Sequence, residues 1–248
     1  MKRLLGVISL LAAFTCYAAN KSLKPPEILH KSRQLVLVTT PTWNAIEGTL
    51  QCYERKKFAY GWKPVGDPVP VIIGEDGLAL VAEFQHYPIK GPLKKEGDRR
   101  TPMGVYELGP LFGFDKQSTL SKNVDYIPIN PSTVCVDDQK SRFYNKIIDS
   151  RTVSKPDWDS KEEMRDIPIY EYGSVIQYNT QQPISGSGSC IFLHLWREPS
   201  QKGTAGCIVM DEEHLKEIFS WLDQSQKPTI AIFTKPFYAD IRAKWELP

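Results

Sequence analysis

Short runs of apolar and β-branched residues, separated by turn-forming residues, recur along this chain and indicate strands. The clearest examples are residues 34–40, 48–54 and 229–234. Further strands are predicted at residues 57–62, 69–73, 78–84, 174–179, 190–196 and 208–210. The pattern predicts a mostly β fold, a β-rich α+β domain with a few short helices.

Two segments have the features of helices, and a third has those of a tight turn. After Asp211, a residue type that often caps helices, four apolar residues recur at helical spacing: Leu215, Ile218, Phe219 and Leu222. Residues 156–165 predict a short surface helix. Residues 74–77, with the sequence Gly-Glu-Asp-Gly, predict a hairpin turn between the strands at 69–73 and 78–84.

The first residues have the three parts of a secretory signal peptide. Lys2 and Arg3 precede an apolar run at residues 4–16, and small residues follow it. This run is shorter than the ~20 residues that cross a bilayer, so we expect no stable membrane span after cleavage. We expect export to the bacterial periplasm or cell envelope. The chain then divides into a signal peptide at 1–19, a polar linker at 20–32 and one large domain at 33–248.

The charge of the chain argues against one class of partner. The formal net charge is +2, and loss of Lys2 and Arg3 with the signal peptide would leave equal numbers of basic and acidic residues. Proteins that bind nucleic acid need a basic surface. We therefore expect no nucleic-acid partner, and we expect a monomer.

Four cysteines remain after cleavage of the signal peptide: Cys52, Cys135, Cys190 and Cys207. An even number in an oxidising compartment allows two disulfides, and a Cys190–Cys207 bond would leave no thiol at position 207. If Cys207 is free, Cys52–Cys135 is the pair we allow. The spacing shows no CxxC pair and no Cys/His cluster, so we expect no metal site.

His194 and Cys207 are the strongest candidates for chemistry. Alternation along the strand at 190–196 puts His194 on one face and the apolar Leu193 and Leu195 on the other. A polar loop then leads to Cys207, and an imidazole beside a thiol is the minimum for a cysteine nucleophile. A buried cysteine is also commonly a small hydrophobe, and a strand histidine is often only structural.

The residues before Cys207 favour the catalytic interpretation. Gly206 lacks a Cβ, which lets the backbone bend and lets a substrate carbonyl approach closely. The N–H groups of Gly206 and Cys207 could then form an oxyanion site, to which Thr204 could add a hydroxyl.

Two sequence motifs resemble those of a known family. GTAGCIVM, preceded by FLHLW, resembles the active-site signature of YkuD-like L,D-transpeptidases, and GDRRTPMGVY at 97–106 is similar to an upstream segment of that family. The resemblance implies β-sandwich or barrel-like sheets, Cys207 as nucleophile and His194 as general base. It also implies Gly206 in the oxyanion loop, Thr204 at a Ser/Thr position, and no cofactor.

The chain departs from the family pattern at several positions. Ala205 stands where many members have a second histidine, and Val209 stands where many have Arg or Asn. The loop from His194 to Cys207 is also shorter than is common. The chain therefore resembles a divergent branch, with TAGC in place of SHGC.

The resemblance further implies peptidoglycan stem peptides as substrate and partner. Five residues are candidate substrate contacts: Arg100, Tyr144, Asn145, Trp196 and Arg197. Residues 101–104 are predicted as a turn that forms a wall of the cleft. The alternatives are an L,D-carboxypeptidase or endopeptidase of the same fold, or a non-catalytic cell-wall-binding module. A papain-like hydrolase is disfavoured because His194 precedes Cys207.

Overall fold

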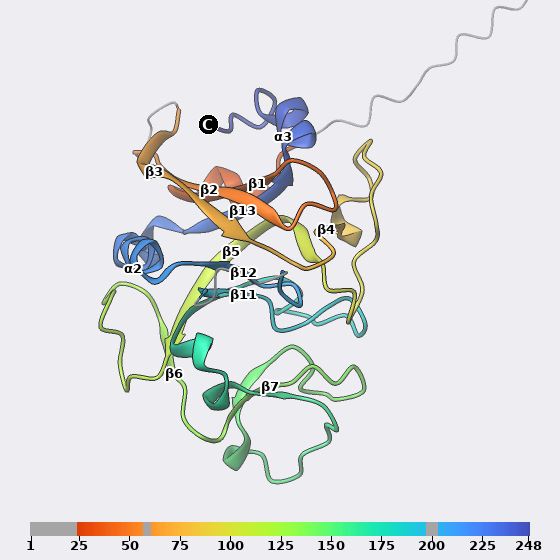
Figure 1. Cartoon of the computed structure of the whole chain (residues 1–248), viewed down its shortest axis with the longest axis vertical. Coiled ribbons are helices and arrows are strands. Elements are labelled where there is room, and N and C mark those ends of the chain that lie inside the picture. The colour runs from red at the N-terminus through yellow and green to blue at the C-terminus, as the bar shows by residue number, and fades with distance from the viewer. Residues whose placement is uncertain (1–23, 57–60, 197–202) are drawn as a thin grey trace, which may run out of the picture.

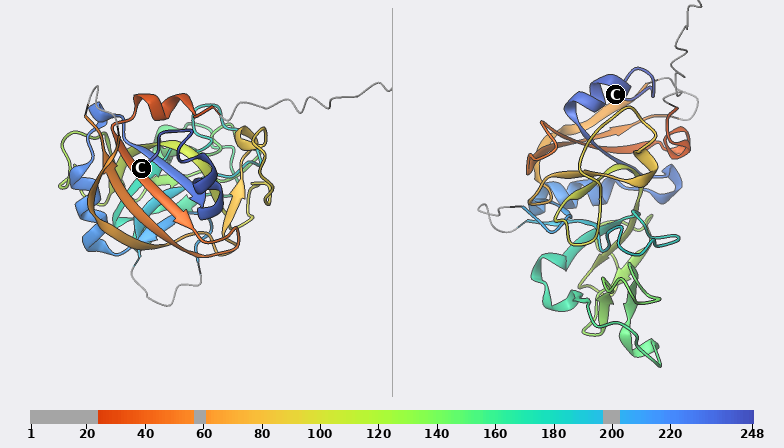
Figure 2. Two further views of the ribbon diagram at one scale, coloured as in Figure 1. Left: turned by 90° about the horizontal axis from the view of Figure 1, so that it is seen from above. Right: turned by 90° about the vertical axis from the view of Figure 1, so that its right-hand side faces the viewer.

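The protein folds around a β-barrel, as a computed structural model shows for residues 24–56, 61–196 and 203–248. A ten-stranded sheet follows the order β10-β11-β12-β3-β2-β1-β13-β5-β4, and β6 pairs with β5. Because β5 also pairs with β10, the sheet closes on itself, and Figure 2 shows the resulting barrel from above. The predicted fold class, a β-rich domain with barrel-like sheets, is therefore confirmed.

The bounds of the strands in the large sheet are as follows. They are β1 Gln34–Thr40, β2 Glu47–Glu54, β3 Lys63–Ile72, β4 Leu78–Leu80, β5 Thr101–Gly113, β6 Tyr126–Pro128, β10 Tyr172–Ile176, β11 Phe192–Leu195, β12 Ile208–Met210 and β13 Thr229–Thr234.

A second, small sheet lies below the barrel in Figure 1. Its order is β8-β7-β9, with β7 at Thr133–Cys135, β8 at Ile147–Asp149 and β9 at Glu162–Glu163. The helices are short: α1 Glu27–Lys31, α2 Glu212–Trp221 and α3 Lys235–Ile241, with 3₁₀ turns η1 Ala82–Phe84, η2 Ser150–Thr152, η3 Met164–Asp166, η4 Pro168–Glu171 and η5 Gln224–Gln226. In the described part of the chain, no helix is both long enough and apolar enough to cross a membrane.

Strand alternation produces two hydrophobic clusters on opposite faces of β11. Leu193 and Leu195 belong to the main core, which also holds Ile208 of β12 and most of the large buried aliphatic residues. Phe192 belongs to a second cluster, with Phe112 of β5. Burying one such side chain stabilises the fold by roughly 1.5–3 kcal/mol. The face of β11 that carries His194 is therefore packed against a second layer and is not open to solvent.

Several predicted elements are confirmed. The strands at 34–40, 48–54, 208–210 and 229–234 correspond to β1, β2, β12 and β13, and those at 174–179 and 190–196 correspond to β10 and β11. The helix after Asp211 is α2, and the carboxylate of Asp211 accepts a hydrogen bond from the His214 N–H at 3.1 Å.

The predicted hairpin at residues 74–77 is wrong in its pairing. A tight turn is present, because the Gly77 N–H donates to the Gly74 carbonyl at 2.8 Å. However, β3 pairs with β2 and β12, while β4 pairs in parallel with β5. The predicted strand at 78–84 ends at Leu80 and continues into η1. In the closed barrel, β3 and β4 each pair with other strands and not with each other.

Three further predictions differ from the structure. The helix predicted at 156–165 is absent; this stretch consists of bends, β9 and the start of η3. Residues 101–104 begin β5 and do not form a turn. In the predicted linker at 20–32, residues 27–31 form α1, because Leu29 is buried in the core.

Two predictions fall wholly or partly outside the described residues. The signal peptide at 1–19 lies outside them, as do residues 57–60 of the strand predicted at 57–62. Residues 61 and 62 are not in a strand, and β3 begins at Lys63.

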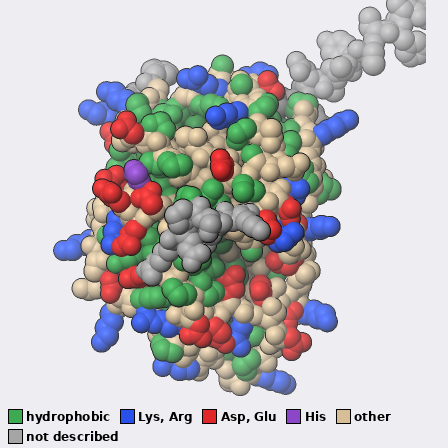
Figure 3. Space-filling model, in the orientation of Figure 1, with side chains coloured by type: hydrophobic (Ala, Val, Ile, Leu, Met, Phe, Trp, Pro, Cys, Tyr) green, Lys and Arg blue, Asp and Glu red, His purple; other side chains and the backbone are tan. Residues whose placement is uncertain are grey.

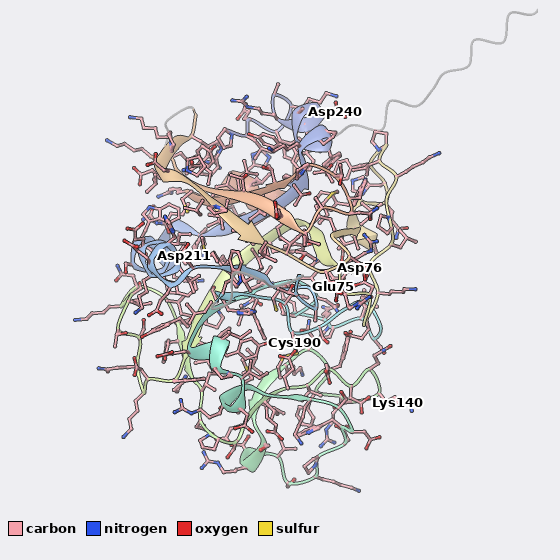
Figure 4. All side chains as sticks on the ribbon, viewed as in Figure 1. Glu75, Asp76, Lys140, Cys190, Asp211 and Asp240 are labelled. Atoms are coloured by element: carbon pink, nitrogen blue, oxygen red, sulfur yellow. A yellow bond between two sulfur atoms is a disulfide. The ribbon has the colours of Figure 1, made fainter. Side chains whose placement is uncertain are left out.

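The disulfide differs from the predicted pairing. Cys135 of β7 is bonded to Cys190, with their Cα atoms 6.1 Å apart, while Cys52 and Cys207 are free. Cys52 lies on β2 in the barrel, so it is not the partner of Cys135. The alternative Cys190–Cys207 disulfide is not formed either. The disulfide joins the small sheet to the barrel, and Figure 4 shows Cys190 where the two meet.

Charged, hydrophobic and other side chains are mixed on the outer surface. On the face in Figure 3, the basic side chains stand mainly around the outline, with acidic and hydrophobic side chains between them. That face therefore has no continuous basic surface among the residues described.

Candidate active site

His194 and Cys207 lie on the same face of two adjacent strands. β11 and β12 are parallel, with Leu193 opposite Ile208 and His194 opposite Val209. Because side chains alternate, Cys207, which immediately precedes Ile208, points to the same side as His194. Both residues line a cavity of about 370 Å³ between the barrel and the small sheet. The register of β11 and β12 thus brings the two predicted residues to one cavity.

The turn before Cys207 is held by side-chain hydrogen bonds. Thr204 Oγ1 donates to the Cys207 carbonyl at 2.6 Å and accepts from the Gly206 N–H at 3.0 Å. Thr101 Oγ1 of β5 donates to the Gly206 carbonyl at 2.8 Å and accepts from the Gly74 N–H at 2.9 Å. These contacts fix the backbone beside the thiol. To bind an oxyanion, the Gly206 N–H would have to exchange its bond to Thr204.

Gly206 is required by geometry at its position. Its φ is +144°, in the region that side-chain-bearing residues rarely adopt. A Cβ there would lie 3.0 Å from Ile191 Cδ1 and 3.1 Å from the Arg100 carbonyl oxygen. A glycine at position 206 is therefore required by the turn that presents the sulfur of Cys207.

The Cys207 thiol is buried but has polar contacts. Its sulfur accepts a hydrogen bond from the Phe192 N–H at 3.3 Å and donates to the Cys190 carbonyl at 3.4 Å. Burial raises the pKa of the thiol well above its usual range, and the nearby carboxylate of Glu162 raises it further. The Phe192 N–H, Lys94 and the hydroxyl of Tyr170 act in the opposite direction on this pKa.

His194 is oriented by a backbone carbonyl. Its Nδ1 lies 3.0 Å from the Leu195 carbonyl oxygen, so Nδ1 carries the proton in the neutral ring. Burial lowers the pKa of His194 to about 4, against the opposing effect of hydrogen bonds to the backbone of Leu195 and Ile169. The ring is therefore neutral near pH 7. Within the described residues it shares the cavity with Cys207 but is not hydrogen-bonded to it.

Tyr170 of η4 lies over this face and was not predicted from the sequence. Its ring packs edge-on against His194, with centroids 5.1 Å apart, and against Phe192, at 5.4 Å. Its hydroxyl donates to Glu162 Oε2 at 2.7 Å. The backbone of the preceding residue, Ile169, acts on His194 in addition to the Leu195 carbonyl, and both raise the pKa of the imidazole.

Three carboxylates line the same cavity: Glu96, Asp137 and Glu162. Burial raises the pKa of Glu162 to about 7, and Asp137 and Glu96 add to the shift. Asp137 Oδ1 is buried and has no hydrogen-bond partner among the described residues. The sequence carried no sign of this acidic lining, since Glu162 lies in the stretch predicted as a surface helix.

Two of the predicted substrate contacts hold the scaffold instead. The Asn145 amide donates to the carbonyls of Tyr178 and Asn179 and its oxygen accepts from the Cys190 N–H at 2.8 Å. Tyr144 donates its hydroxyl to Glu96 and accepts from the Gly188 N–H at 3.0 Å. Both side chains are buried and do not line the cavity. They position the segment that leads into β11.

The other predicted contacts also lie outside the cavity or outside the described residues. The guanidinium of Arg100 donates to Asn44 Oδ1 at 3.1 Å and to the Leu78 carbonyl at 3.0 Å, away from the thiol. Arg99 lines the cavity in its place and pairs with Glu75, which Figure 4 labels. Trp196 continues β11, since its N–H donates to the Met210 carbonyl at 2.6 Å. Arg197 is not among the described residues.

No metal-binding cluster is found in the residues that the structure describes, where no three His, Cys, Asp or Glu side chains are placed to hold an ion. The chemistry that the arrangement can perform with these side chains is nucleophilic and acid–base. A thiol, an imidazole, a phenol and three carboxylates share one cavity.

Comparisons with known proteins identify the family of this chain. Residues 47–231 match the family model YkuD, described as the L,D-transpeptidase catalytic domain. The crystal structure of the helical cell shape determining protein Pgp2 from Campylobacter jejuni is similar with a TM-score of 0.40 and 16% identity, over 81% of this chain and 47% of that one. This chain thus spans about half of that protein. No curated protein matches it significantly in sequence. The family match covers most of the chain, including β11, β12 and the residues that line the cavity, and the chain belongs to the YkuD family of L,D-transpeptidase catalytic domains.

Proposed function

We propose that this protein is an exported, cysteine-dependent L,D-transpeptidase that acts on peptidoglycan stem peptides. The observation that carries the proposal is the placement of Cys207. It is a free thiol at the end of a glycine turn, in a cavity that also holds His194. Family membership supplies the reaction class, and the Cys135–Cys190 disulfide supports an oxidising compartment.

The proposed reaction begins when His194 removes the proton of the Cys207 thiol. The thiolate attacks the carbonyl carbon of an amide in the stem peptide, and the C–N bond then breaks as His194 returns the proton to the leaving amine. A thioester to Cys207 remains. The Leu195 carbonyl, which lies 3.0 Å from Nδ1, is the third group of this arrangement, because it orients the imidazole.

The acyl group then passes to an amine or to water. An amine acceptor gives a cross-link or an attachment, whereas water makes the protein an L,D-carboxypeptidase or endopeptidase. The Cys207 carbonyl and the Gly206 N–H are both bonded to Thr204, so an oxyanion site requires this turn to rearrange. Removal of one oxyanion donor costs roughly 3–4 kcal/mol of transition-state stabilisation in a well-studied protease.

The deciding experiment is intact-protein mass spectrometry of the mature chain with a disaccharide-tetrapeptide, beside Cys207→Ala. We expect an adduct equal in mass to the donor without its terminal D-residue, absent from Cys207→Ala. Cross-linked product in the same reaction identifies transfer, and trimmed product alone identifies hydrolysis. Equal turnover by Cys207→Ala would refute the proposal. Absence of both adduct and product would favour a non-catalytic cell-wall-binding module.

A further inference from the structure

Lys94 and Asp98 form a buried ion pair in the loop that precedes β5. Lys94 Nζ donates to Asp98 Oδ1, and the two side chains are only 3% and 5% exposed. The Lys–Glu pairs at the same spacing on α1 and α2 are much more exposed. Moving two charges out of water costs free energy that their attraction only offsets, so a buried pair adds little net stability. Its burial instead favours a role in fixing one arrangement of the chain around it.

The Asp98 carboxylate organises residues 94–100 into one compact turn. Its Oδ1 also accepts a hydrogen bond from the Arg100 N–H, and its Oδ2 accepts one from the Lys95 N–H, both at 2.9 Å. The Lys94 ammonium donates in addition to the Lys95 carbonyl at 3.1 Å. Both charged groups therefore bond the backbone as well as each other, and the ion pair fixes the shape of this turn.

The end of this turn supports the backbone before Cys207. Arg100, whose N–H is held by Asp98, has its carbonyl oxygen 3.1 Å from the position that a Cβ on Gly206 would occupy. The next residue, Thr101, donates its hydroxyl to the Gly206 carbonyl at 2.8 Å. A shift of Arg100 would therefore disturb both contacts to the glycine that precedes the proposed nucleophile.

The middle of the turn holds the segment that leads into β11. The Glu96 N–H donates to the Gly186 carbonyl at 2.7 Å, and Ser189 Oγ donates to Glu96 Oε2 at 2.7 Å. The stem of Lys94 packs on Gly188, where an added Cβ would lie 2.9 Å from Lys94 Cε. This segment is therefore held against the turn both by polar contacts and by close packing.

The two supports meet at the Cys207 sulfur. The segment held by Glu96 leads directly to Cys190, whose carbonyl accepts the hydrogen bond from the thiol at 3.4 Å. Neither Lys94 nor Asp98 is among the residues that line the cavity, so the pair acts on the thiol through the backbone.

We propose that Lys94 and Asp98 are positioning residues, which set the place of the Cys207 thiol for attack. The inference rests on the proposed role of Cys207 as nucleophile. The ion pair fixes the turn at residues 94–100 between the two backbone segments that border the sulfur. Without the pair, the thiol loses its fixed position between the Gly206 turn and the Cys190 carbonyl.

The test compares the double variant Lys94→Met/Asp98→Asn with the wild type in steady-state kinetics on a disaccharide-tetrapeptide. Met and Asn are close in size to the residues they replace, and removal of both charges of a buried pair commonly leaves stability almost unchanged. We expect kcat to fall about 10²-fold, since a displacement of about 1 Å can have that effect, and KM to change less. Wild-type kcat in the folded double variant would overturn the proposal. So would a larger change in KM than in kcat, because the pair would then shape the binding surface.

Hydrogen exchange followed by mass spectrometry gives a readout that does not depend on activity. In the double variant, amide exchange should become faster in residues 94–101, 186–192 and 203–208 and keep its wild-type rate in β1 and β2. Equally faster exchange in β1 and β2 would show a loss of stability throughout the barrel, and it would overturn the positioning role.

Tyr144→Phe provides a second variant that leaves the ion pair intact. It keeps the ring but removes the hydroxyl that donates to Glu96 and accepts from the Gly188 N–H. We expect a smaller fall in kcat and faster exchange confined to residues 186–192. Wild-type kcat together with wild-type exchange in this segment would contradict its role in holding the thiol.

The exposed ion pair on α1 provides the matched control. Lys31 Nζ lies 2.6 Å from Glu27 Oε1, at the same spacing in sequence as the buried pair. Glu27→Gln/Lys31→Met should keep wild-type kcat and wild-type exchange in residues 186–192. A fall in kcat equal to that of the buried-pair variant would overturn the assignment, because the loss of charge alone would then account for it.

Failure of this inference and failure of the proposed function give different results. If Cys207→Ala abolishes the acyl adduct while Lys94→Met/Asp98→Asn keeps wild-type kcat, only the positioning role is refuted. If Cys207→Ala retains turnover, the proposed function itself fails, whereas exchange in residues 186–192 and 203–208 still shows whether the pair holds these segments.

Discussion

Among the described residues, two cysteines are free, Cys52 and Cys207, and they are almost equally buried but have different surroundings. Their exposed fractions are 6% and 7%. Cys52 lies within β2 and packs in the main core, and burial alone raises its pKa to about 12. Cys207 lies between the barrel and the small sheet, where Phe192, Tyr170 and Lys94 each favour its thiolate.

Burial alone therefore does not identify a nucleophile in this protein. Both thiols are raised in pKa by desolvation, as expected for a charge moved from water into an apolar interior. What distinguishes Cys207 is a set of donors and acceptors that can hold a thiolate and take its proton. The predictions below test this contrast.

The largest effect is expected from exchange of the two cysteines for alanine. Cys207→Ala should lose acyl-adduct formation entirely, because no other group in the cavity can form the thioester. Cys52→Ala should keep wild-type turnover and lose about 1–2 kcal/mol of stability through the small core cavity. Turnover assays and urea unfolding measure the two outcomes. Equal loss of turnover in both variants would contradict the distinction between a reactive Cys207 and a structural Cys52.

A second large effect is expected at His194. His194→Gln should lower kcat/KM by about 10²–10⁴-fold, the usual contribution of a positioned acid–base residue. His214→Gln is the matched control, since His214 lies on α2, and its Nδ1 contacts Asp211 at 2.7 Å. Steady-state kinetics on both variants provide the measurement. A wild-type rate in His194→Gln would remove the base role.

Loss of the disulfide should affect Cys207 and leave Cys52 unchanged. The double variant Cys135→Ala/Cys190→Ala should lose about 2–5 kcal/mol of stability, as small exported domains do without a native disulfide. It should also lower adduct formation, because Cys190 and the small sheet help to hold the sulfur. Unfolding curves and adduct yields under conditions where the variant is folded would show this. An unchanged adduct yield in the folded variant would show that the small sheet does not support the site.

The smallest effect is expected at Thr101, which supports the turn on the Cys207 side. Thr101→Val would leave the Gly206 carbonyl and the Gly74 N–H without their partner. An unsatisfied buried polar group costs about 1–3 kcal/mol, so the free energy of unfolding should fall by this order. Thr49→Val, on β2, is a control, because the Thr49 hydroxyl makes no such bond to the other described residues. Equal stability of Thr101→Val and the wild type would contradict this account of the turn.

The local pattern of apolar and polar residues was sufficient to predict many strands of the barrel. β1, β12 and β13 were predicted with their observed bounds, since β-branched runs and alternation encode a strand without reference to its partner. The same applies to α2, whose apolar positions recur at the helical period. The helix predicted at 156–165 was wrong because β9 there is formed by pairing with β7, a contact that its own residues do not signal.

The site was only partly predictable for the same reason. Alternation put His194 on the face opposite Leu193, and the register with β12 put Cys207 beside it. Tyr170 and Glu162 were missed because they reach the cavity from η4 and β9, which carry no local signature of a site. Arg100 was included on its motif, yet its guanidinium donates a hydrogen bond to the Leu78 carbonyl of β4.

By itself, then, the sequence determined the strand and helix periods, the face of β11 that carries His194, and the family of the chain. Only the tertiary structure decided that Cys207 lies on the same face as His194, that Cys135 bonds Cys190, that β4 pairs with β5, and that Tyr170 packs against His194 and Phe192. The physical reason is range. Periodicity and turn chemistry act between residues close in sequence, whereas disulfide partners, strand partners and cavity linings depend on how the closed barrel brings distant segments together.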